Sequence, residues 1–297
     1  MRLNSSRRKR LVPWLLSALL ALVLSITWMS YPGLLDAPEN PTLTVMSYNI
    51  RVGVGGGAQR LPAAEGLEKV ARVIERYKPD VLLVQEIEKG AERTQGLNEV
   101  DWLRRRLDFT SAAFAPAIRD GSWSYGVALF GRFQAQVSSG TYLLYKPDYS
   151  ESHPEYPAYY SEQRVLLRAT GCIGDTTLSF YCTHLGLTAD QRERQVQDIL
   201  QHLERESHPI ILGGDFNAQP GSAELKPLRE RYRDVFEVLS VPMEQRWSFP
   251  AGTSPKRAID TIFVSPGIEV LRAFVIRDES LASDHNPVVA ELRLPGP

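Results

Sequence analysis

Apolar runs and amphipathic stretches alternate along the chain from residue 42 onward. Short apolar runs bounded by turn residues predict buried strands, and apolar residues spaced three and four apart predict helices. The predicted strands are 43–50, 81–86, 125–132, 165–171, 177–185, 208–214, 258–266, 268–276 and 286–294, and the predicted helices are 67–78, 100–107 and 189–204. This mixture indicates an α/β domain over residues 42–297, with helices covering its sheets.

Polar side chains stand where several of these apolar strands begin or end. They are Asn49, Glu86, His184, Asp215, Asn217, Asp260, Asp284 and His285. Each one alone has an ordinary explanation, such as a turn, a cap or an ion pair. Ligands gather at strand ends in helix-covered sheets, however, because loops there carry side chains on a rigid base. We therefore expect these residues to form one site instead of several independent turns.

The residue types in this set favour chemistry on phosphate. Carboxylate and amide oxygens without a thiolate cluster are hard ligands that suit Mg²⁺ or Mn²⁺. A histidine held by a carboxylate can stay protonated near neutral pH and stabilise an anionic phosphate. Asp215 beside such a phosphate could orient and deprotonate water. Together these groups predict metal-assisted hydrolysis of a phosphate ester.

Motifs in a defined order resemble the endonuclease/exonuclease/phosphatase superfamily, which has the pancreatic-deoxyribonuclease-like fold. The resemblance covers roughly residues 43–294 and rests on SYNI (47–50), VQE (84–86), YGVALFGR (125–132), QRVLLRA (163–169), THL (183–185), GGDFNAQP (213–220), AIDTIFVS (258–265) and SDHNPVVAEL (283–292). It implies a four-layer α/β/β/α sandwich, in which two mixed sheets pack face to face between outer helices. It also implies a hydrolase that acts on phosphoester bonds.

The resemblance implies a metal site and a charged histidine. Asn49 and Glu86 match metal-binding positions, with Glu86 as the principal ligand, and Asp284 matches a position near the metal. His285 matches the residue that contacts the scissile phosphate, and Asp260 matches the carboxylate that orients and charges it. The implied metal is Mg²⁺, with Mn²⁺ as an alternative.

The remaining matches imply roles in proton transfer and phosphate binding. Asp215 matches the residue that aligns or activates water, and Asn217 matches one that binds a phosphate oxygen. His184 matches the second histidine, which part of the family uses as general acid. Arg164 matches a phosphate-contacting arginine, and a surface charge on a strand is the alternative for this residue. We expect Tyr125 near the site, on a looser match.

Two segments depart from the family pattern. Residues 51–66 are rich in glycine, so we expect a flexible loop beside the site. The segment lacks the particular acidic residue that some family members use as an additional metal ligand. Residues 146–163 contain four tyrosines, Tyr149, Tyr156, Tyr159 and Tyr160. These tyrosines could stack on nucleic-acid bases, sit at a membrane interface or pack over a sheet edge.

The N-terminal residues predict membrane insertion. Residues 1–10 hold a basic block, and residues 11–29 carry no charge, which is about the length of one transmembrane helix. We predict a cytoplasmic basic segment at 1–10, a transmembrane signal anchor at 11–30 and a linker at 31–41. A cleaved signal peptide and a buried core helix are the alternatives. With an anchor the catalytic domain is membrane-bound outside the cytoplasm, and with cleavage it is secreted.

The two cysteines, Cys172 and Cys182, do not indicate a disulfide. If Gly174 and Asp175 turn a hairpin, the cysteines lie on neighbouring strands well out of register. A disulfide needs Cα atoms within ~7 Å, so two reduced thiols are favoured.

Charge bears on the substrate. Outside residues 1–36 the chain has 29 basic and 34 acidic residues, a net charge of −5, whereas affinity for nucleic acid grows with the phosphates that Lys and Arg neutralise. A tethered domain also meets lipid head groups at high effective concentration. We therefore favour a phospholipid head group or a related small phosphodiester. The alternatives are an exported DNA or RNA nuclease and a catalytically silent, membrane-tethered binding module. The sequence identifies no protein partner.

Overall fold

The computed structural model describes residues 40–133, 138–252, 254, 256–277 and 281–295. Its contacts separate Met1–Asn40 from Pro41–Pro297, and the fold below is that of the second unit. The predicted segments 1–10 and 11–30, and nearly all of the linker, lie outside the described residues. Among the helices that are described, none is both long enough and apolar enough to cross a membrane.

Two mixed sheets of six strands form the centre of the unit. The first has the order β11-β12-β1-β2-β4-β3 and the second the order β5-β6-β7-β8-β10-β9. The first sheet consists of β1 (Thr42–Asn49), β2 (Val81–Lys89), β3 (Ser111–Asp120), β4 (Trp123–Gly131), β11 (Glu269–Val275) and β12 (Val288–Arg293). The second consists of β5 (Ser138–Leu143), β6 (Val165–Ile173), β7 (Thr176–His184), β8 (Ile210–Asp215), β9 (Arg233–Asp234) and β10 (Asp260–Val264). Within each sheet one central pair is parallel, β1 with β2 and β7 with β8.

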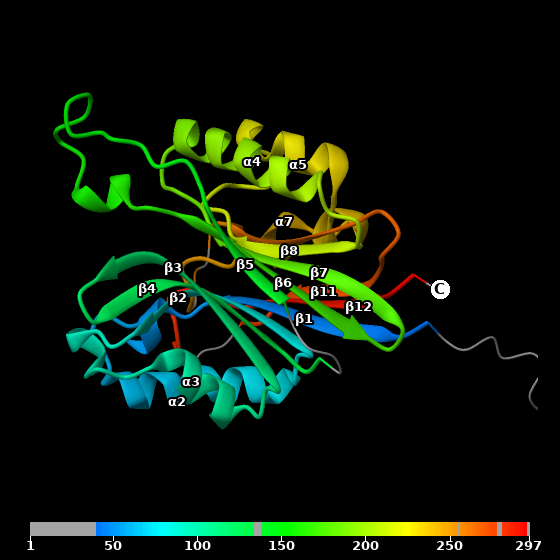
Figure 1. Cartoon of the computed structure of the whole chain (residues 1–297), viewed down its shortest axis with the longest axis horizontal. Coiled ribbons are helices and arrows are strands. Elements are labelled where there is room, and N and C mark those ends of the chain that lie inside the picture. Colours follow the sequence, from blue (N-terminus) through cyan, green and yellow to red (C-terminus); the bar gives the residue numbers. More distant parts are fainter. Residues whose placement is uncertain (1–39, 134–137, 253, 255, 278–280, 296–297) are drawn as a thin grey trace, which may run out of the picture. The chain divides into compact units, whose positions relative to one another are not determined.

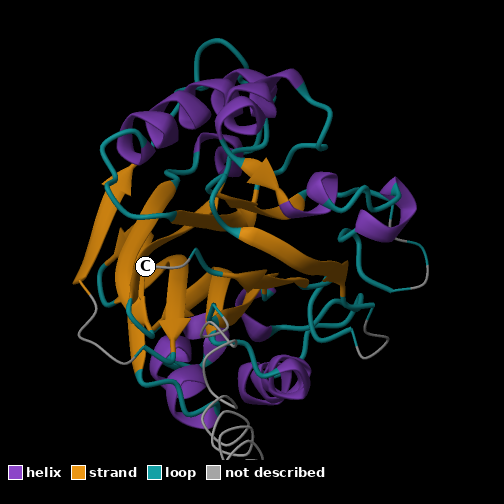
Figure 2. Ribbon diagram, turned by 90° about the vertical axis from the view of Figure 1, so that its right-hand side faces the viewer, coloured by secondary structure: helices purple, strands orange, loops and turns teal. Residues whose placement is uncertain are grey.

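Helices cover the outer face of each sheet, which completes four layers (Figures 1 and 2). The first sheet is covered by α2 (Ala63–Tyr77) and α3 (Glu99–Arg106), and the second by α4 (Ala189–Leu203) and α5 (Lys226–Arg231). Short elements complete the chain: η1 (Arg51–Gly53), η2 (Glu92–Thr94), η3 (Ala158–Ser161), η4 (Ala223–Leu225), α6 (Val235–Val238) and α7 (Met243–Arg246). The predicted α/β/β/α sandwich is confirmed.

The first four residues of strand β2 show why the central strands contain continuous apolar runs. Leu83 packs into the core between the two sheets, whereas Leu82 and Val84 pack under the helices of the first layer. Because successive side chains of a strand point to opposite faces, a strand buried on both faces needs apolar residues at every position. Leu67 and Val70, at helical spacing on α2, close the outer core.

The hairpin predicted at Gly174 is present between β6 and β7. Cys172 lies opposite Thr177, whereas Cys182 lies opposite Leu167 near the other end of the hairpin. Both cysteines are free, as the register predicts.

A side chain at Gly66 should destabilise the fold, because the backbone of another segment lies directly against this glycine. A Cβ atom at this position of α2 would lie 1.7 Å from the carbonyl oxygen of Gly53, a backbone atom that cannot rotate away. Overpacking of this kind costs roughly 1–3 kcal/mol, so we expect Gly66→Ala to lower the unfolding free energy by about that amount in urea titrations. Gly221→Ala is the control, because a Cβ there meets no atom within 4 Å. Equal unfolding midpoints for the two variants would contradict the packing shown at α2.

Candidate active site

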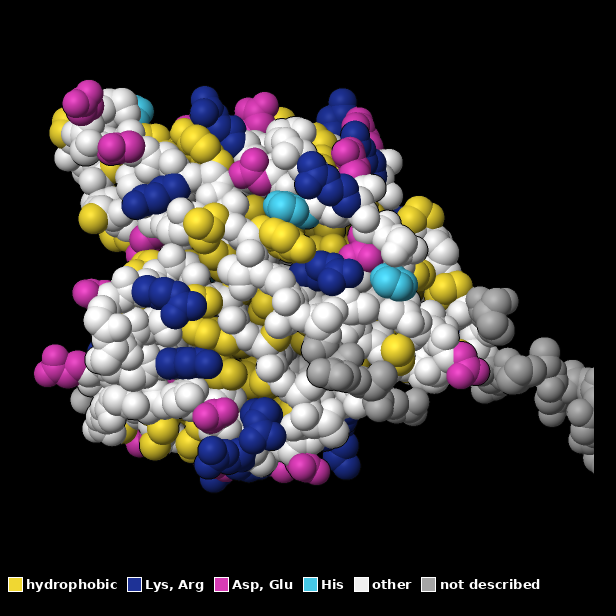
Figure 3. Space-filling model, viewed as in Figure 1, with side chains coloured by type: hydrophobic (Ala, Val, Ile, Leu, Met, Phe, Trp, Pro, Cys, Tyr) yellow, Lys and Arg dark blue, Asp and Glu magenta, His cyan; other side chains and the backbone are white. Residues whose placement is uncertain are grey.

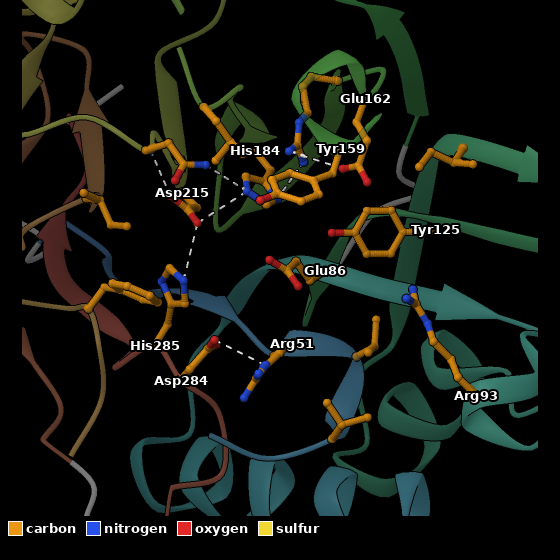
Figure 4. Close-up of a pocket in the computed structure, with 18 of the residues that line it drawn as sticks. Arg51, Glu86, Arg93, Tyr125, Tyr159, Glu162, His184, Asp215, Asp284 and His285 are labelled. Carbon is orange, nitrogen blue, oxygen red and sulfur yellow. Dashed lines mark hydrogen bonds and ion pairs between the residues drawn. The ribbon is translucent and has the colours of Figure 1, made fainter. Parts of the chain in front are cut away.

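One cavity of about 480 Å³ lies where strands of both sheets end (Figure 4). Seven of the nine predicted site residues line it: Glu86, Arg164, His184, Asp215, Asn217, Asp284 and His285. The other two are buried behind this lining, where Asn49 contacts Glu86 and Asp260 contacts His285. The structure therefore brings all nine residues together, although four lie on one sheet or its loops and five on the other.

A β-bulge directs Glu86 into the cavity. The pairing of β2 with β4 shifts register between Gln85 and Ile87, and Glu86 between them has a φ of 53°. A non-glycine residue in this region costs of order 1–3 kcal/mol, and bulges commonly re-aim side chains at functional sites. The predicted strand 81–86 thus continues past the site residue to Lys89.

Asn49 joins the two sheets at the base of the cavity. Its Nδ2 donates to Glu86 Oε1 at 3.0 Å and to Asp215 Oδ2 at 3.1 Å, and its Oδ1 accepts from the backbone N–H of Arg51 at 3.1 Å. Because the amide group faces both carboxylates, Asn49 in this arrangement positions them. Its role as a direct metal ligand stays a prediction.

Asp260 holds His285 through a buried hydrogen bond. The Nδ1 of His285 lies 2.9 Å from Asp260 Oδ2, and its Nε2 lies 3.6 Å from Asp215 Oδ2. Burial lowers the pKa of His285, but the nearby carboxylates of Asp260, Asp215 and Asp284 together raise it above its ordinary value. The imidazole is therefore protonated near neutral pH and presents an N–H toward the cavity.

His184 has the opposite electrostatic environment. Burial, and then the charges of Arg164 and His285, lower the pKa of His184 well below its ordinary value. The Nη1 of Arg164 lies 3.3 Å from His184 Nδ1, and the amide Nδ2 of Asn217 lies 3.1 Å from His184 Nε2. Because both neighbours are N–H donors, they disfavour a proton on each ring nitrogen. The two histidines therefore differ in charge: burial and the charge of Arg164 disfavour a proton on His184, whereas the surrounding carboxylates favour one on His285.

Asp215 lies at the end of β8 between the two histidines. Its Oδ1 accepts from the backbone N–H of Asn217 at 2.9 Å, which forms an Asx turn after the strand. Its Oδ2 lies 3.5 Å from His184 Nε2. Burial, followed by the negative charge of Asp260, raises the pKa of Asp215. A raised pKa makes this carboxylate a better proton acceptor than an ordinary aspartate.

The cavity contains one carboxylate that suits a cation particularly well. Asp284 lies 3.3 Å from Arg51, and Glu162 lies 3.3 Å from Arg164. Asp215 faces the two histidines, whereas Glu86 forms no ion pair within 4 Å among the described residues. Since Asn49 gives Glu86 its one hydrogen bond from those residues, the other carboxylate oxygen is available. This donor set fits a hard divalent cation at Glu86, with Asp284 beside it.

A second group of potential ligands lies deeper. Ligand atoms of Asp215, Asp260 and His285 all lie within 4.8 Å of one another. His285 Nδ1 is already hydrogen-bonded to Asp260, and a protonated imidazole has no lone pair to give a metal. This group is therefore less suited to a metal than the carboxylate of Glu86, whose role as the principal ligand stays a prediction.

The segment predicted as a flexible loop, residues 51–66, lies beside the site, where it has buried residues and a hydrogen bond to a distant part of the chain. Val52 and Val54 are buried, and the backbone N–H of Gly56 donates to the carbonyl of Leu281 at 2.8 Å. Arg51 from this segment reaches Asp284 (Figure 4). The sequence did not identify Arg51, because its partner lies at the other end of the chain.

The tyrosine-rich segment projects from the second sheet between β5 and β6 (green, Figure 1). Its tyrosine rings pack on one another, with Tyr149 and Tyr156 centroids 5.5 Å apart and Tyr156 and Tyr160 centroids 4.6 Å apart. Tyr159 is 51% exposed and lines the cavity. Tyr125, which the sequence predicted near the site, also lines it. The segment thus forms part of the cavity rim.

Comparisons with known proteins agree with this fold. A sequence profile of the Endonuclease/Exonuclease/phosphatase family matches residues 46–285, more than half of the chain. The chain belongs to the endonuclease/exonuclease/phosphatase family. No curated protein matches it.

Solved structures with the same fold come from bacteria and animals. An endonuclease/exonuclease/phosphatase from Beutenbergia cavernae DSM 12333 is 22% identical, with a TM-score of 0.67 over 86% of this chain and 72% of that one. The human Nocturnin catalytic domain with bound sulfate anion is 20% identical, with a TM-score of 0.63 over 85% of this chain and 93% of that one. D. rerio TDP2 complexed with single strand DNA product is 19% identical, with a TM-score of 0.61 over 85% of this chain and 99% of that one. At these identities the likeness establishes the fold alone.

Proposed function

We propose that this protein is a divalent-metal-dependent phosphodiesterase that hydrolyses its substrate by in-line attack of water. One observation carries the proposal: His285 held by Asp260, the buried carboxylate of Asp215 and the carboxylate of Glu86, which forms no ion pair within 4 Å among the described residues, all face the same cavity. A binding module that does no chemistry has no need for a buried carboxylate of raised pKa opposite a charged imidazole.

The chain's own residues supply proton transfer and charge stabilisation. Asp215 accepts a proton from water, while the Nε2–H of His285 donates to an oxygen of the phosphate that gains negative charge. Asp260 keeps His285 oriented and charged. Asn217 binds a phosphate oxygen, Arg164 adds positive charge from the cavity wall, and His184 lies on the side of the leaving oxygen.

Glu86 would hold the cation, with Asp284 and Asn49 adjoining it. Mg²⁺ fits this oxygen-rich set, and Mn²⁺ accepts the same ligands. When bound, such a cation supplies Lewis-acid stabilisation of the phosphate charge.

For the substrate we propose a phospholipid head group or a related small phosphodiester. The cavity, at about 480 Å³, has the size of a site for a small molecule. On the face seen in Figure 3, basic side chains are interspersed with acidic ones and do not form one continuous basic surface. An exported nuclease is the second candidate, supported by the arginines and aromatic rings that line the cavity.

A side-by-side substrate panel tests this proposal. We expect Mg²⁺-dependent release of product from sphingomyelin, phosphatidylinositol or an inositol phosphate ester, with weak dependence on salt. Plasmid DNA and single-stranded RNA are the comparison substrates. Efficient plasmid nicking that falls steeply with salt, with lipids untouched, would reject the lipid proposal in favour of a nuclease.

We propose further that residues 11–30 anchor the protein with its catalytic domain outside the cytoplasm. The support is the basic block before an uncharged stretch of membrane-spanning length. Protease added to intact cells should cut the domain, and the full-length chain should stay in the membrane fraction. A domain protected until the cells are lysed would overturn the orientation, and soluble chain of native length would overturn the anchor.

A further inference from the structure

A buried carboxylate outside the predicted site fixes one arginine of the cavity wall. Arg93 lies in η2 and donates from Nε and Nη2 to Glu88 Oε2, at 2.8 and 2.6 Å. The hydroxyl of Thr94 donates to the other oxygen of Glu88 at 2.6 Å. The Glu88 side chain is fully buried, whereas that of Arg93 is 44% exposed. Both carboxylate oxygens of Glu88 therefore accept hydrogen bonds from η2 and hold it in place.

Burying the carboxylate of Glu88 costs free energy that its partners must offset. A buried charge costs several kcal/mol unless it is paired and hydrogen-bonded. Glu99 adds no second negative charge beside Glu88 near neutral pH, because burial raises the pKa of the Glu99 carboxyl to about 8. Its carboxyl accepts the backbone N–H of Glu88 at 2.8 Å. The Glu88–Arg93 pair is thus a single, well-fixed ion pair directly beneath the cavity surface.

The free edge of Arg93 faces the cavity at a distance from the catalytic residues. Arg93 lines the cavity together with Trp123 and Tyr125 of β4, and its guanidinium lies 5.7 Å from the Tyr125 ring. Figure 4 shows Arg93 and Tyr125 on the side of Glu86 opposite to His285. A substrate whose reacting phosphate lies at His285 would extend past Glu86 to reach Arg93.

The guanidinium keeps hydrogen-bonding capacity for a ligand. Arginine has five N–H donors, and Glu88 takes one from Nε and one from Nη2. The other three have no hydrogen-bond acceptor among the described residues. A planar guanidinium with a free, pre-oriented edge is suited to the paired oxygens of a phosphate group.

We propose that Arg93 binds a second phosphate group of the substrate, and that Glu88 is the positioning residue that orients it. This inference rests on the proposed function, because it takes the reacting phosphate to lie at His285 and Asp215. It narrows the substrate to a phosphodiester that carries a further phosphate, as a phosphorylated inositol head group and a nucleotide chain both do. Trp123 and Tyr125 would pack against the part of the substrate between the two phosphates.

Matched ligand pairs test the second phosphate by calorimetry on the full-length protein with Mg²⁺. One pair is inositol 1-phosphate and inositol 1,4-bisphosphate, and the other is thymidine 5′-monophosphate and thymidine 3′,5′-bisphosphate. We expect the additional phosphate to tighten binding at least tenfold in one pair, and the pair that gains identifies the source of the phosphate. Arg93→Gln and Glu88→Gln should each abolish this gain while leaving the monophosphate affinity within about twofold. Arg119→Gln removes the same charge from the neighbouring β3, outside the cavity lining, and should keep the gain.

Three results would overturn the inference. They are the absence of a gain in both pairs, a gain that persists in Arg93→Gln, and an equal loss of mono- and bisphosphate affinity, which would mean that the ion pair only supports the fold. Thermal unfolding of each variant verifies that it is folded, and Arg93→Lys replaces Arg93→Gln if the latter is not. A wild-type protein that shows the gain but hydrolyses no phosphoester would refute the proposed function and leave the phosphate site standing.

Discussion

Asp215→Asn and His285→Ala should each lower kcat by ~10²-fold or more, an increase of about 2.7 kcal/mol in the activation barrier. The asparagine keeps the size of Asp215 and an oxygen for the backbone N–H of Asn217, but it cannot accept a proton from water. The alanine removes the charged N–H that Asp260 holds toward the phosphate. Initial rates on bis(p-nitrophenyl) phosphate at saturating substrate measure both effects.

A buried aspartate of the same sheet gives the matched control. Asp234 is buried on β9, where it accepts from Thr261 and the first turn of α6, and it does not line the cavity. Asp234→Asn should keep kcat within a few-fold of wild type even if it lowers stability. A folded Asp215→Asn or His285→Ala variant with a wild-type rate would remove that residue from the mechanism.

Glu86→Ala should abolish high-affinity binding of the cation and lower kcat by ~10²-fold or more. The reason is that Glu86 forms no ion pair within 4 Å among the described residues, whereas the other carboxylates that line the cavity do. Titration of Mn²⁺ followed by electron paramagnetic resonance measures the binding without reference to turnover. The fold should survive, because the side chain lies in the cavity and not in the hydrophobic core.

Glu224→Ala controls for the loss of a partly buried glutamate. Glu224 is paired with Arg192 at 2.6 Å and lies outside the cavity lining. It should leave both Mn²⁺ affinity and kcat close to wild type. If Glu86→Ala bound Mn²⁺ as tightly as Glu224→Ala, the cation would have to lie elsewhere, with the group around Asp260 as the next place to look.

The sequence predicted the central strands of both sheets and the edge strand β11, but it missed the edge strands β3, β5 and β9. β3 and β5 are the longer of the missed strands. β5 has mostly exposed side chains, and β3 contains Pro116 next to a shift in register. An edge strand can be polar and tolerate proline, because on one side there is no neighbouring strand to which a backbone N–H has to donate. Such strands lack the apolar run on which sequence prediction depends.

The site shows a similar division between local and distant information. Residues such as Asp215 and Glu86 could be found because each follows an apolar strand directly. Nothing local revealed that Glu86 leaves the alternation of β2 through a bulge, since that is a property of its pairing with β4. Arg51 was missed because its partner Asp284 is remote in sequence. Arg93 was missed because its significance depends on the burial of Glu88.

The most direct test of the account is metal-dependent turnover by the purified full-length protein. Bis(p-nitrophenyl) phosphate is the substrate, with Mg²⁺ added, removed by EDTA and restored. We predict that EDTA stops the hydrolysis and that added Mg²⁺ restores it. The Asp215→Asn variant should show no such hydrolysis under the same conditions. Failure to hydrolyse this ester or any member of a broad phosphoester panel with Mg²⁺ or Mn²⁺ would contradict the account and identify the chain as a binding module on this fold.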